Sequence, residues 1–318
     1  MTEGGNHFDA EAVARRLWQI DGLTVSQGEL LRSWTHFRAG GPADLLVQPA
    51  TGESLAELKK LCVRENWPLT VLGRATNVLV SDLGIRGITA ILSPSLGGIR
   101  CEGEALICQA GVPLYEIAAM AARLGLSGFE FACGIPGSAG GAVIMNAGAF
   151  EGSMSDLVAR TAYIDALGEI RELFGDEHDF SYRHSYFANE PGAVILEIEI
   201  RLNRVPATEI YGRMADFARR RYLTQPLDSF SAGSAFRRPE GYFAGKLISD
   251  AGMKGYTRGR AGVSAKHAGF IVNHGGATAQ EIARIFSDVR RAVFDMEGVL
   301  LQPEVRLAGE WEGDPFAI

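Results

Sequence analysis

Two glycine-rich segments are the first feature of this sequence whose residue types could bind a ligand. One contains Gly134, Gly137, Gly140 and Gly141, and the other is the run Gly-Arg-Ala-Thr-Asn at residues 73–77. Successive backbone N–H groups in such loops can form a concave anion site, and the missing side chains let a phosphate approach the backbone. Two loops of this kind suit a pyrophosphate. Neither matches GxGxxG or GxxxxGK[ST], so the alternative that these glycines only make tight turns stays open.

Cysteine and histidine spacing predicts neither a metal site nor a disulfide framework. The four cysteines form no CxxC pair, and we expect free thiols in a reducing cytosol. The histidines show no ligand spacing among themselves, so no metal is predicted.

Alternating helices and strands must position these loops. A loose tail is expected over residues 1–8, followed by a helix through Leu17. The run Ser-Leu-Ala-Glu at residues 54–57 has the form of a capping box that opens a second helix. Residues 114–124, rich in alanine and leucine, predict a third helix. Strands are expected over four stretches: residues 68–72, 78–80, 88–110 and 159–202.

The C-terminal third has a different character. The run at residues 195–202 alternates at period two beyond its first residue, which predicts a half-buried strand. A domain boundary is expected near residues 204–206, and a basic amphipathic helix ending in Arg219–Arg221 follows. The run Thr278–Glu281 opens a further helix whose apolar face contains Ile282, Ile285, Phe286, Val289 and Val293. A strand over residues 299–307 closes the chain.

Length and composition narrow the class of protein. The chain has 318 residues, of which 47% are hydrophobic, enough for two or three packed domains. The net charge is -7 and no long basic run occurs, which argues against nucleic-acid or anionic-membrane partners. The first residues lack the basic and apolar segments of a secretory signal, and no apolar stretch approaches the ~20 residues of a membrane span. A cytoplasmic location is expected.

Eight ordered motifs carry a resemblance to a known family. They lie at residues 35–44, 72–77, 129–142, 182–185, 231–239, 244–248, 266–273 and 303–306. In this order they resemble the UDP-N-acetylenolpyruvoylglucosamine reductase family, from about residue 30 to about residue 309. The short interval between Arg183 and Val194 is similar to the shorter class of that family, which lacks an inserted loop that closes over the substrate.

The resemblance implies an α+β fold with a two-part FAD-binding domain of the vanillyl-alcohol-oxidase type and a smaller α+β substrate domain. The expected limits are residues 1–92 and 93–205 for the two FAD-binding subdomains, and residues 206–318 for the UDP-sugar domain. It further implies a monomeric enzyme of peptidoglycan synthesis. With NADPH as reductant and tightly bound FAD, it would reduce UDP-N-acetylglucosamine enolpyruvate to UDP-N-acetylmuramate.

The resemblance also implies site residues. Ser234 matches the proton donor, Arg183 matches the arginine that grips the enolate, and Glu304 matches a carboxylate near it. The implied FAD-binding residues are Gly73, Arg74, Ala75, Thr76, Asn77, Val78, Gly134, Ile135, Gly137, Ser138, Gly140, Gly141, Asn146 and Ala147. The expected substrate-binding residues are Arg220, Arg238 and Lys246, with Arg237 as a further candidate for the phosphates. His184 is interpreted as an ordinary packed or surface histidine.

Two departures from the family pattern stand out. The family usually has Gly-Gly-Ser or Gly-Asn-Gly-Ser ahead of the asparagine, where this chain has Arg74-Ala75-Thr76. The loss of glycines restricts φ in the loop, although Arg74 could add a favourable charge. Many members have a lysine where this chain has Thr224. Arg220, Arg221 or Arg238 are the candidates to supply that charge.

Three rival interpretations remain. An oxidase of the same flavin fold would share the glycine loops but not Ser234, Glu304 and Arg183 together. A catalytically silent protein that binds flavin or a UDP-sugar would not need those three side chains. A structural domain without a ligand would not need the paired glycine loops.

Overall fold

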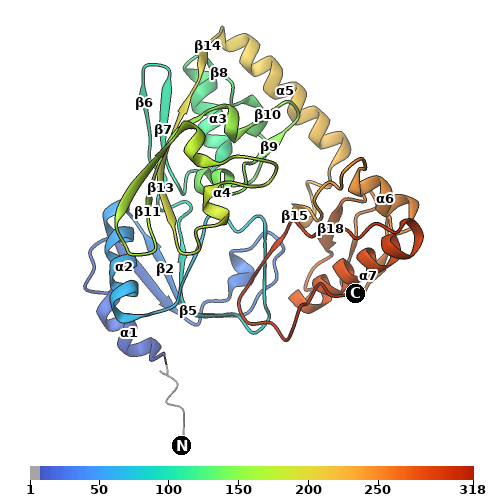
Figure 1. Cartoon of the computed structure of the whole chain (residues 1–318), viewed down its shortest axis with the longest axis horizontal. Coiled ribbons are helices and arrows are strands. Elements are labelled where there is room, and N and C mark those ends of the chain that lie inside the picture. Colours follow the sequence, from blue (N-terminus) through green and yellow to red (C-terminus); the bar gives the residue numbers. More distant parts are fainter. Residues whose placement is uncertain (1–7) are drawn as a thin grey trace, which may run out of the picture. The chain divides into compact units, whose positions relative to one another are not determined.

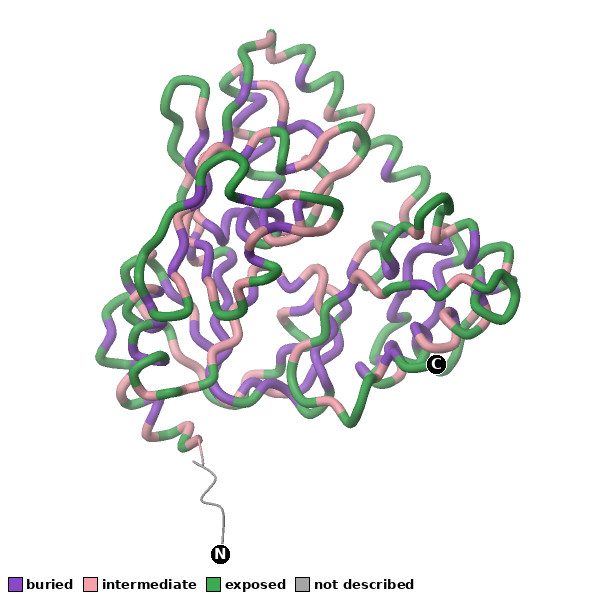
Figure 2. Tube along the Cα trace, in the orientation of Figure 1, coloured by how far each residue is buried: buried purple, intermediate pink, exposed green. Residues whose placement is uncertain are grey.

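The computed structural model describes residues 8–318, so the tail expected over residues 1–8 lies outside the described residues except for Phe8. The chain forms two compact units (Figure 1), each with its own buried interior (Figure 2). Unit 1 contains the chain up to residue 29 together with residues 43–74 and 86–215, and unit 2 contains residues 30–42, 75–85 and 216–318. The division into three functional domains with limits at residues 92 and 205 stays a prediction.

The first part of unit 1 is a four-stranded sheet with two helices. The strand order is β1 (Leu23–Gln27), β2 (Ala43–Pro49), β5 (Ile85–Ile91) and β3 (Leu69–Leu72). The pair β1–β2 is antiparallel, whereas β3 and β5 are parallel. Helices α1 (Ala10–Leu17) and α2 (Gly52–Glu65) accompany it, and Leu55 and Leu58 of α2 are fully buried. The predicted helix through Leu17 and the strand near residues 68–72 are confirmed.

The start of α2 corrects one prediction. The N-cap is Thr51, whose Oγ1 accepts a hydrogen bond from Ser54 N at 3.1 Å, while the Ser54 hydroxyl accepts from Thr51 N at 3.2 Å. The prediction that Ser54 opens this helix is therefore wrong, since Ser54 is the third helical residue. A threonine one turn earlier has the extended backbone that a cap requires, and it satisfies the first free amides instead.

The second part of unit 1 is a five-stranded antiparallel sheet. Its order is β12 (Ile170–Phe174), β11 (Val158–Ile164), β13 (Val194–Arg201), β7 (Ala105–Gln109) and β6 (Ile99–Glu102). Helices α3 (Leu114–Arg123) and α4 (Ala139–Ile144) contact β7, and α4 also contacts β13. In β13, Ile198 and Ile200 are buried and alternate with the half-buried Glu197 and Glu199, as the period-two pattern predicts.

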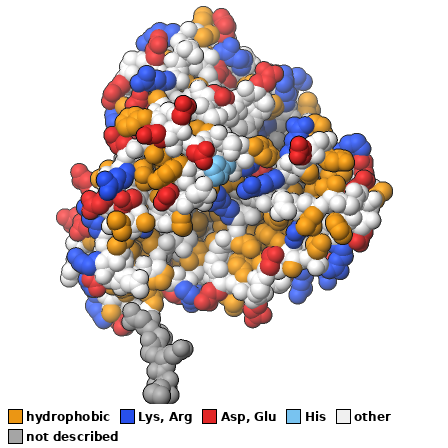
Figure 3. Space-filling view, in the orientation of Figure 1, with side chains coloured by type: hydrophobic (Ala, Val, Ile, Leu, Met, Phe, Trp, Pro, Cys, Tyr) orange, Lys and Arg blue, Asp and Glu red, His pale blue; other side chains and the backbone are white. Residues whose placement is uncertain are grey.

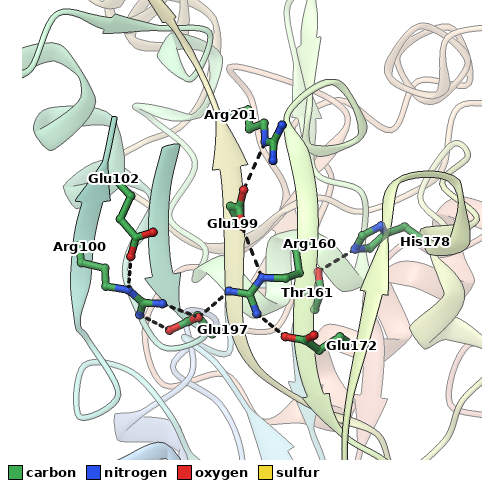
Figure 4. Close-up of polar contacts among 9 residues, drawn as sticks. All are labelled: Arg100, Glu102, Arg160, Thr161, Glu172, His178, Glu197, Glu199 and Arg201. Carbon is green, nitrogen blue, oxygen red and sulfur yellow. Dashed lines mark hydrogen bonds and ion pairs between the residues drawn. The ribbon is translucent and has the colours of Figure 1, made fainter. Parts of the chain in front are cut away.

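A ladder of charges joins four strands of this sheet (Figure 4). Arg160 of β11 bonds Glu172 of β12 at 2.7 Å and Glu197 of β13 at 2.9 Å. Glu197 in turn accepts a 2.5 Å bond from Arg100 of β6. Because the Arg160 and Glu197 side chains are 18% and 21% exposed, the network is better shielded than an isolated surface pair. These pairs fasten the outer strands to the central ones.

Three further sheets of the described residues have only two short strands each. They are β8 (Leu126–Ser127) with β14 (Asn203–Arg204), β9 (Gly148–Ala149) with β10 (Gly152–Ser153), and β4 (Val78–Val80) with β19 (Arg306–Ala308). The last pair is parallel and belongs to unit 2. The predicted strand over residues 299–307 is thus only partly present, because regular pairing begins at Arg306.

Unit 2 is built on a four-stranded antiparallel sheet. Its order is β15 (Phe230–Ser234), β18 (Phe270–Asn273), β17 (Ala261–Val263) and β16 (Thr257–Arg258), with helices α6 (Ala244–Asp250) and α7 (Ala279–Glu297). The predicted basic helix is α5 (Ala207–Thr224), a single helix that begins in unit 1 and ends in unit 2. Among helices of the described residues, none is long and apolar enough to cross a bilayer.

The core of unit 2 forms around α7. Thr278 caps this helix through Glu281, and the five predicted apolar side chains at residues 282, 285, 286, 289 and 293 are all 0% exposed. Both predictions are confirmed. Segments from earlier in the chain join this core, since Phe37 and Leu79 pack in it and the Asp82 carboxylate accepts from Ala279 N at 2.8 Å. On the face shown in Figure 3, Lys and Arg side chains are interspersed with Asp and Glu.

Candidate functional site

The two glycine loops meet at Ser138 in unit 1. A Cβ atom added at Gly73 would lie 2.1 Å from Ser138 Oγ, and one added at Gly141 would lie 3.3 Å from it. Ser138 is 2% exposed, and its hydroxyl has no hydrogen-bond partner among residues 8–318. An unsatisfied buried hydroxyl is costly, so it implies a partner from outside the chain. A hydroxyl donor beside two positions without side chains fits a phosphate oxygen of FAD.

The backbone amides of the longer loop serve mainly to hold it in place. Ala139 N donates to Val112 O at 2.8 Å and Gly140 N donates to Ala110 O at 2.9 Å. A Cβ atom at Gly140 would lie 2.9 Å from the Cβ of Ala110, so this glycine permits close packing of α4 against the end of β7. The close-packing interpretation of the glycines therefore applies to Gly140, and it also applies to Gly73, because Ser138 Oγ lies where a side chain at residue 73 would begin.

Arg74 fastens the shorter loop to the longer one. Its Nε donates to Pro136 O at 2.7 Å, and its guanidinium lies 5.6 Å from the centre of the Tyr115 ring. The next residue, Ala75, has φ +48 and is 4% exposed. The loop thus keeps a left-handed backbone that favours glycine, although alanine makes it less favourable by about 1 kcal/mol. Alanine at this position therefore adopts a backbone conformation that glycine adopts more readily.

The turn that contains Arg183 is also in unit 1. Ser181 and His184 exchange two backbone hydrogen bonds of 3.2 Å, and Arg183 between them has φ +56. The Arg183 guanidinium lies 5.1 Å from the centre of the Tyr182 ring. His184 Nε2 contacts Asp179 Oδ2 at 3.2 Å, which is an ordinary surface interaction. Asn146, whose place among the flavin-binding residues stays a prediction, contacts this turn: its Nδ2 donates to Ser181 O at 3.0 Å.

Unit 2 brings Ser234 and Glu304 onto neighbouring segments. Ala235, next to Ser234, donates its N–H to Gly269 O at 2.8 Å and accepts from Glu304 N at 2.9 Å. Gly233 has φ +77, and the register of β15 against β18 shifts between Ser231 and Ser234. Such a bulge changes the direction of the following side chain, and Ser234 is exposed.

Asn77 is attached to the same segment of unit 2. Its Nδ2 donates to Glu304 O at 3.2 Å, and its carbonyl accepts from Arg306 N at 3.0 Å. Thr76 and Val78 flank it, and Val78 begins β4. The structure therefore joins Asn77, Glu304 and Ser234 within unit 2, whereas Arg183 belongs to unit 1.

The predicted substrate-binding residues have local partners. Arg220 Nε pairs with Asp216 at 2.6 Å, Arg238 Nε donates to Tyr242 O at 3.2 Å, and Lys246 pairs with Asp250. The hydrogen bond to Asp250 raises the pKa of Lys246, which keeps it charged. To bind a phosphate, each of these exposed side chains would have to change partner or share it.

Lys266 is a site candidate whose contact the sequence did not predict. Its Nζ donates to Tyr222 O at 2.5 Å and lies 5.2 Å from the centre of the Tyr222 ring. The Lys266 ammonium group therefore lies beside the last turn of α5, at Tyr222. Thr224, the position at which many family members carry a lysine, is two residues further along the chain. The motif at residues 266–273 was the only signal, and it gave no contact because the two segments are distant in sequence.

Comparison with known proteins identifies both parts of the chain. Residues 43–173 match the family model of the FAD binding domain. Residues 225–308 match the C-terminal domain of UDP-N-acetylenolpyruvoylglucosamine reductase. The remaining comparisons concern whole chains.

Two curated relatives and one solved structure agree. The UDP-N-acetylenolpyruvoylglucosamine reductase of Agathobacter rectalis is 43% identical, over 92% of this chain and 96% of its own length. The one from Pediococcus pentosaceus is 44% identical, over 91% and 95%. The crystal structure of the reductase from Thermus caldophilus has a TM-score of 0.78 at 34% identity, covering 90% of this chain and 99% of that one. The chain belongs to the UDP-N-acetylenolpyruvoylglucosamine reductase family, whose members are FAD-dependent oxidoreductases of peptidoglycan synthesis.

Proposed function

We propose that this chain catalyses the NADPH-dependent reduction of UDP-N-acetylglucosamine enolpyruvate to UDP-N-acetylmuramate. The observation that carries the proposal is the backbone pairing that sets the exposed Ser234 next to the segment of Glu304. The hydroxyl group can deliver a proton, and a carboxyl group on the neighbouring segment can change the acidity of that hydroxyl. Family membership indicates the reaction in which these two groups would act.

The predicted FAD-binding residues, in the segments 73–78 and 134–147, would hold the cofactor. Ser138, whose buried hydroxyl lies against Gly73 and has no partner among residues 8–318, would donate to a phosphate oxygen of FAD. Bound FAD would carry reducing equivalents from NADPH to the vinyl end carbon of the enolpyruvyl group. Arg74 keeps the two loops together and Ala75 preserves the shape of the shorter one.

Ser234 would supply the proton to the carbon that bears the carboxylate. A serine hydroxyl is a weak acid, so its neighbours must support it as the proton leaves. Arg183 would bind the substrate carboxylate through its planar fork and stabilise the negative charge that develops on the enolate. Glu304 would act beside the enolate in a protonated or hydrogen-bonded form, because a free carboxylate would repel that charge.

Basic side chains of unit 2 would bind the UDP phosphates. Arg220, Arg238 and Lys246 remain the proposed set, and the position of Lys266 at the end of α5 makes it the best candidate for the charge missing at Thr224. A phosphate would compete with the Tyr222 carbonyl for this ammonium group. The cytoplasmic location and the monomeric state also remain predictions.

Separating the two half-reactions in Ser234→Ala tests this proposal. Anaerobic reduction of the flavin by NADPH should remain within about 2-fold of the unsubstituted enzyme, because no proton from Ser234 is needed there. Reoxidation by the enolpyruvyl UDP-sugar should slow by about 100-fold or more, as for a lost general acid. The matched control is Ser229→Ala, which removes an exposed hydroxyl just before the same strand. Equal slowing of both half-reactions would remove Ser234 from this role.

A further inference from the structure

The Arg183 turn, residues 181–184, has a backbone that an arginine rarely adopts. Arg183 has φ +56 at the third position of a four-residue turn, which usually favours glycine or asparagine. Ser181 and His184 close the turn through two backbone hydrogen bonds of 3.2 Å. A residue other than glycine keeps a left-handed backbone conformation only where the surrounding structure fixes it, and such residues are concentrated at functional sites. The contacts that fix this turn therefore affect where the guanidinium lies.

Two side-chain hydrogen bonds connect the turn and the residue after it to the C-terminal end of α4. Asn146 Nδ2 donates to Ser181 O at 3.0 Å, ahead of Arg183. Ser185 Oγ donates to Ile144 O at 3.0 Å, after Arg183. Ser185 is 0% exposed and Asn146 is 8% exposed, so water competes little for either bond. One turn is thus held on both sides by one short stretch of chain, residues 144–146.

The orientation of the Asn146 amide follows from its partners. Its Oδ1 accepts from Ser155 N at 2.9 Å, and its Nδ2 donates to Ser181 O at 3.0 Å. A backbone N–H can only donate and a carbonyl can only accept, so the amide cannot be reversed without losing both bonds. Asn146 itself has φ +39, which asparagine tolerates better than most residues. The oxygen and the nitrogen of the amide are therefore both engaged within the protein.

We propose that Asn146 is a positioning residue for Arg183 and not a flavin ligand. This inference rests on the proposed role of Arg183. Asn146 fixes the Ser181 carbonyl, the Ser181 carbonyl closes the turn, and the turn aims the guanidinium. A misplacement of about 1 Å at a substrate-binding group can cost about 100-fold in rate. Loss of the amide donor would slow the step that uses Arg183 and would leave cofactor binding unchanged.

Asn146→Asp replaces the amide donor by a second acceptor oxygen and adds one negative charge. Aspartate has the same shape, tolerates positive φ and still accepts from Ser155 N, but it presents an oxygen to Ser181 O. Reoxidation of the reduced flavin by the enolpyruvyl UDP-sugar should slow by about 10- to 100-fold. FAD occupancy and the rate of reduction by NADPH should stay within about 2-fold of the unsubstituted enzyme. The control is Asn189→Asp, which introduces the same charge at an exposed position of the same unit.

A second readout is independent of catalysis. Trypsin cleaves after arginine, and cleavage at an ordered turn tracks the population in which the turn is open. In the full chain with FAD bound, cleavage after Arg183, quantified by mass spectrometry, should be faster in Asn146→Asp than in Asn189→Asp. If Asn146→Asp fails to fold, Asn146→Gly removes both side-chain bonds while permitting φ +39. Unchanged cleavage and unchanged reoxidation in the variant that folds would overturn the proposal.

Combination with Arg183→Ala separates this inference from the proposed function. If Asn146 acts through Arg183, adding Asn146→Asp to Arg183→Ala should slow reoxidation by less than about 2-fold further. An undiminished further loss would overturn the positioning role. Loss of FAD from Asn146→Asp with normal trypsin cleavage would also overturn it and make Asn146 a flavin ligand. Normal reoxidation by Arg183→Ala would contradict the proposed function, while the cleavage rate would still decide whether Asn146 holds the turn.

Discussion

The Arg183 turn and the Ser234 segment are held in different ways. The turn has a left-handed residue at Arg183 and depends on side-chain hydrogen bonds from Asn146 and Ser185. The Ser234 segment is fixed by backbone hydrogen bonds, from Ala235 N to Gly269 O and from Glu304 N to Ala235 O. Backbone pairing survives most side-chain substitutions, whereas a side-chain bond is lost with one. Proposed site residues in the two units should therefore differ in how sensitive they are to substitution around them.

Among substitutions that test this difference between the Arg183 turn and the Ser234 segment, Ser185→Ala should have the largest effect. The substitution leaves the Ile144 carbonyl at the end of α4 without its buried donor, which costs about 1–3 kcal/mol of unfolding free energy. It also releases one side of the Arg183 turn, so reoxidation by the enolpyruvyl UDP-sugar should slow by about 10-fold. Urea unfolding and anaerobic stopped-flow absorbance measure the two effects.

Gln302→Ala is the matched variant for the Ser234 segment. The Gln302 carbonyl accepts from Arg237 N at 2.9 Å through the backbone, so the exposed side chain can be removed without breaking that bond. We expect a change within about 0.5 kcal/mol in stability and a normal reoxidation rate. If Gln302→Ala is as damaging as Ser185→Ala, the distinction between the two segments does not hold.

A smaller effect concerns pH and His178, which ends the helical turn Gly175–His178 ahead of the Arg183 turn. The His178 side chain is buried, and its Nδ1 donates to Gly175 O at 2.8 Å. Its Nε2 accepts from Thr161 Oγ1, also at 2.8 Å (Figure 4). Burial lowers the pKa of His178, with the hydrogen bond to Gly175 opposing it. The unfolded chain therefore binds a proton at a higher pH than the folded chain does.

The stability that neutral His178 provides is present above the unfolded pKa of about 6.5 and is lost as pH falls towards the lowered folded pKa. The unfolding free energy should decrease from pH 7 to pH 5, and the decrease should be smaller in His178→Gln. Urea titrations at each pH measure it. Equal decreases in the two proteins would show that His178 does not titrate in this way.

The smallest effect is expected for Ala75→Gly. Glycine would relieve the backbone strain at φ +48, which stabilises the folded protein by about 1 kcal/mol. The loss of a buried methyl group and the greater entropy of the unfolded chain destabilise it by about as much. Stability should change by less than about 0.5 kcal/mol. Ala232→Gly, in the strand of Ser234, has no such strain to relieve and should destabilise by about 1 kcal/mol or more. Equal losses at both positions would argue against strain at Ala75.

Local patterns predicted the elements that depend on neighbouring residues. The capping box at Thr278 and the apolar face of α7 were readable because the helix period places residues 282, 285, 286, 289 and 293 on one side. The strand β13 was readable from its alternation. The start of α2 was not, since both Thr51 and Ser54 are capping residues, and only the backbone conformation decides between them.

The parts that the sequence did not predict depend on contacts between distant segments. The pairing of β4 with β19 joins residues 78–80 to residues 306–308, and no local signal indicates it. The contact of Asn146 with Ser181 spans 35 residues, and no local signal in the sequence indicates it. The role of the glycine loops in binding FAD stays a prediction. The close contacts that need these glycines, Gly140 with Ala110 and Gly73 with Ser138, were not predictable from the sequence.

The visible spectrum of the purified protein during two anaerobic additions tests the proposed function most directly. We expect a yellow protein that bleaches with NADPH and regains its colour only when the enolpyruvyl UDP-sugar is added. That result would establish the cofactor, the reductant and the substrate together. A flavin that bleaches but is not reoxidised by the sugar would contradict the proposed substrate, and a colourless protein that takes up no added FAD would contradict the account as a whole.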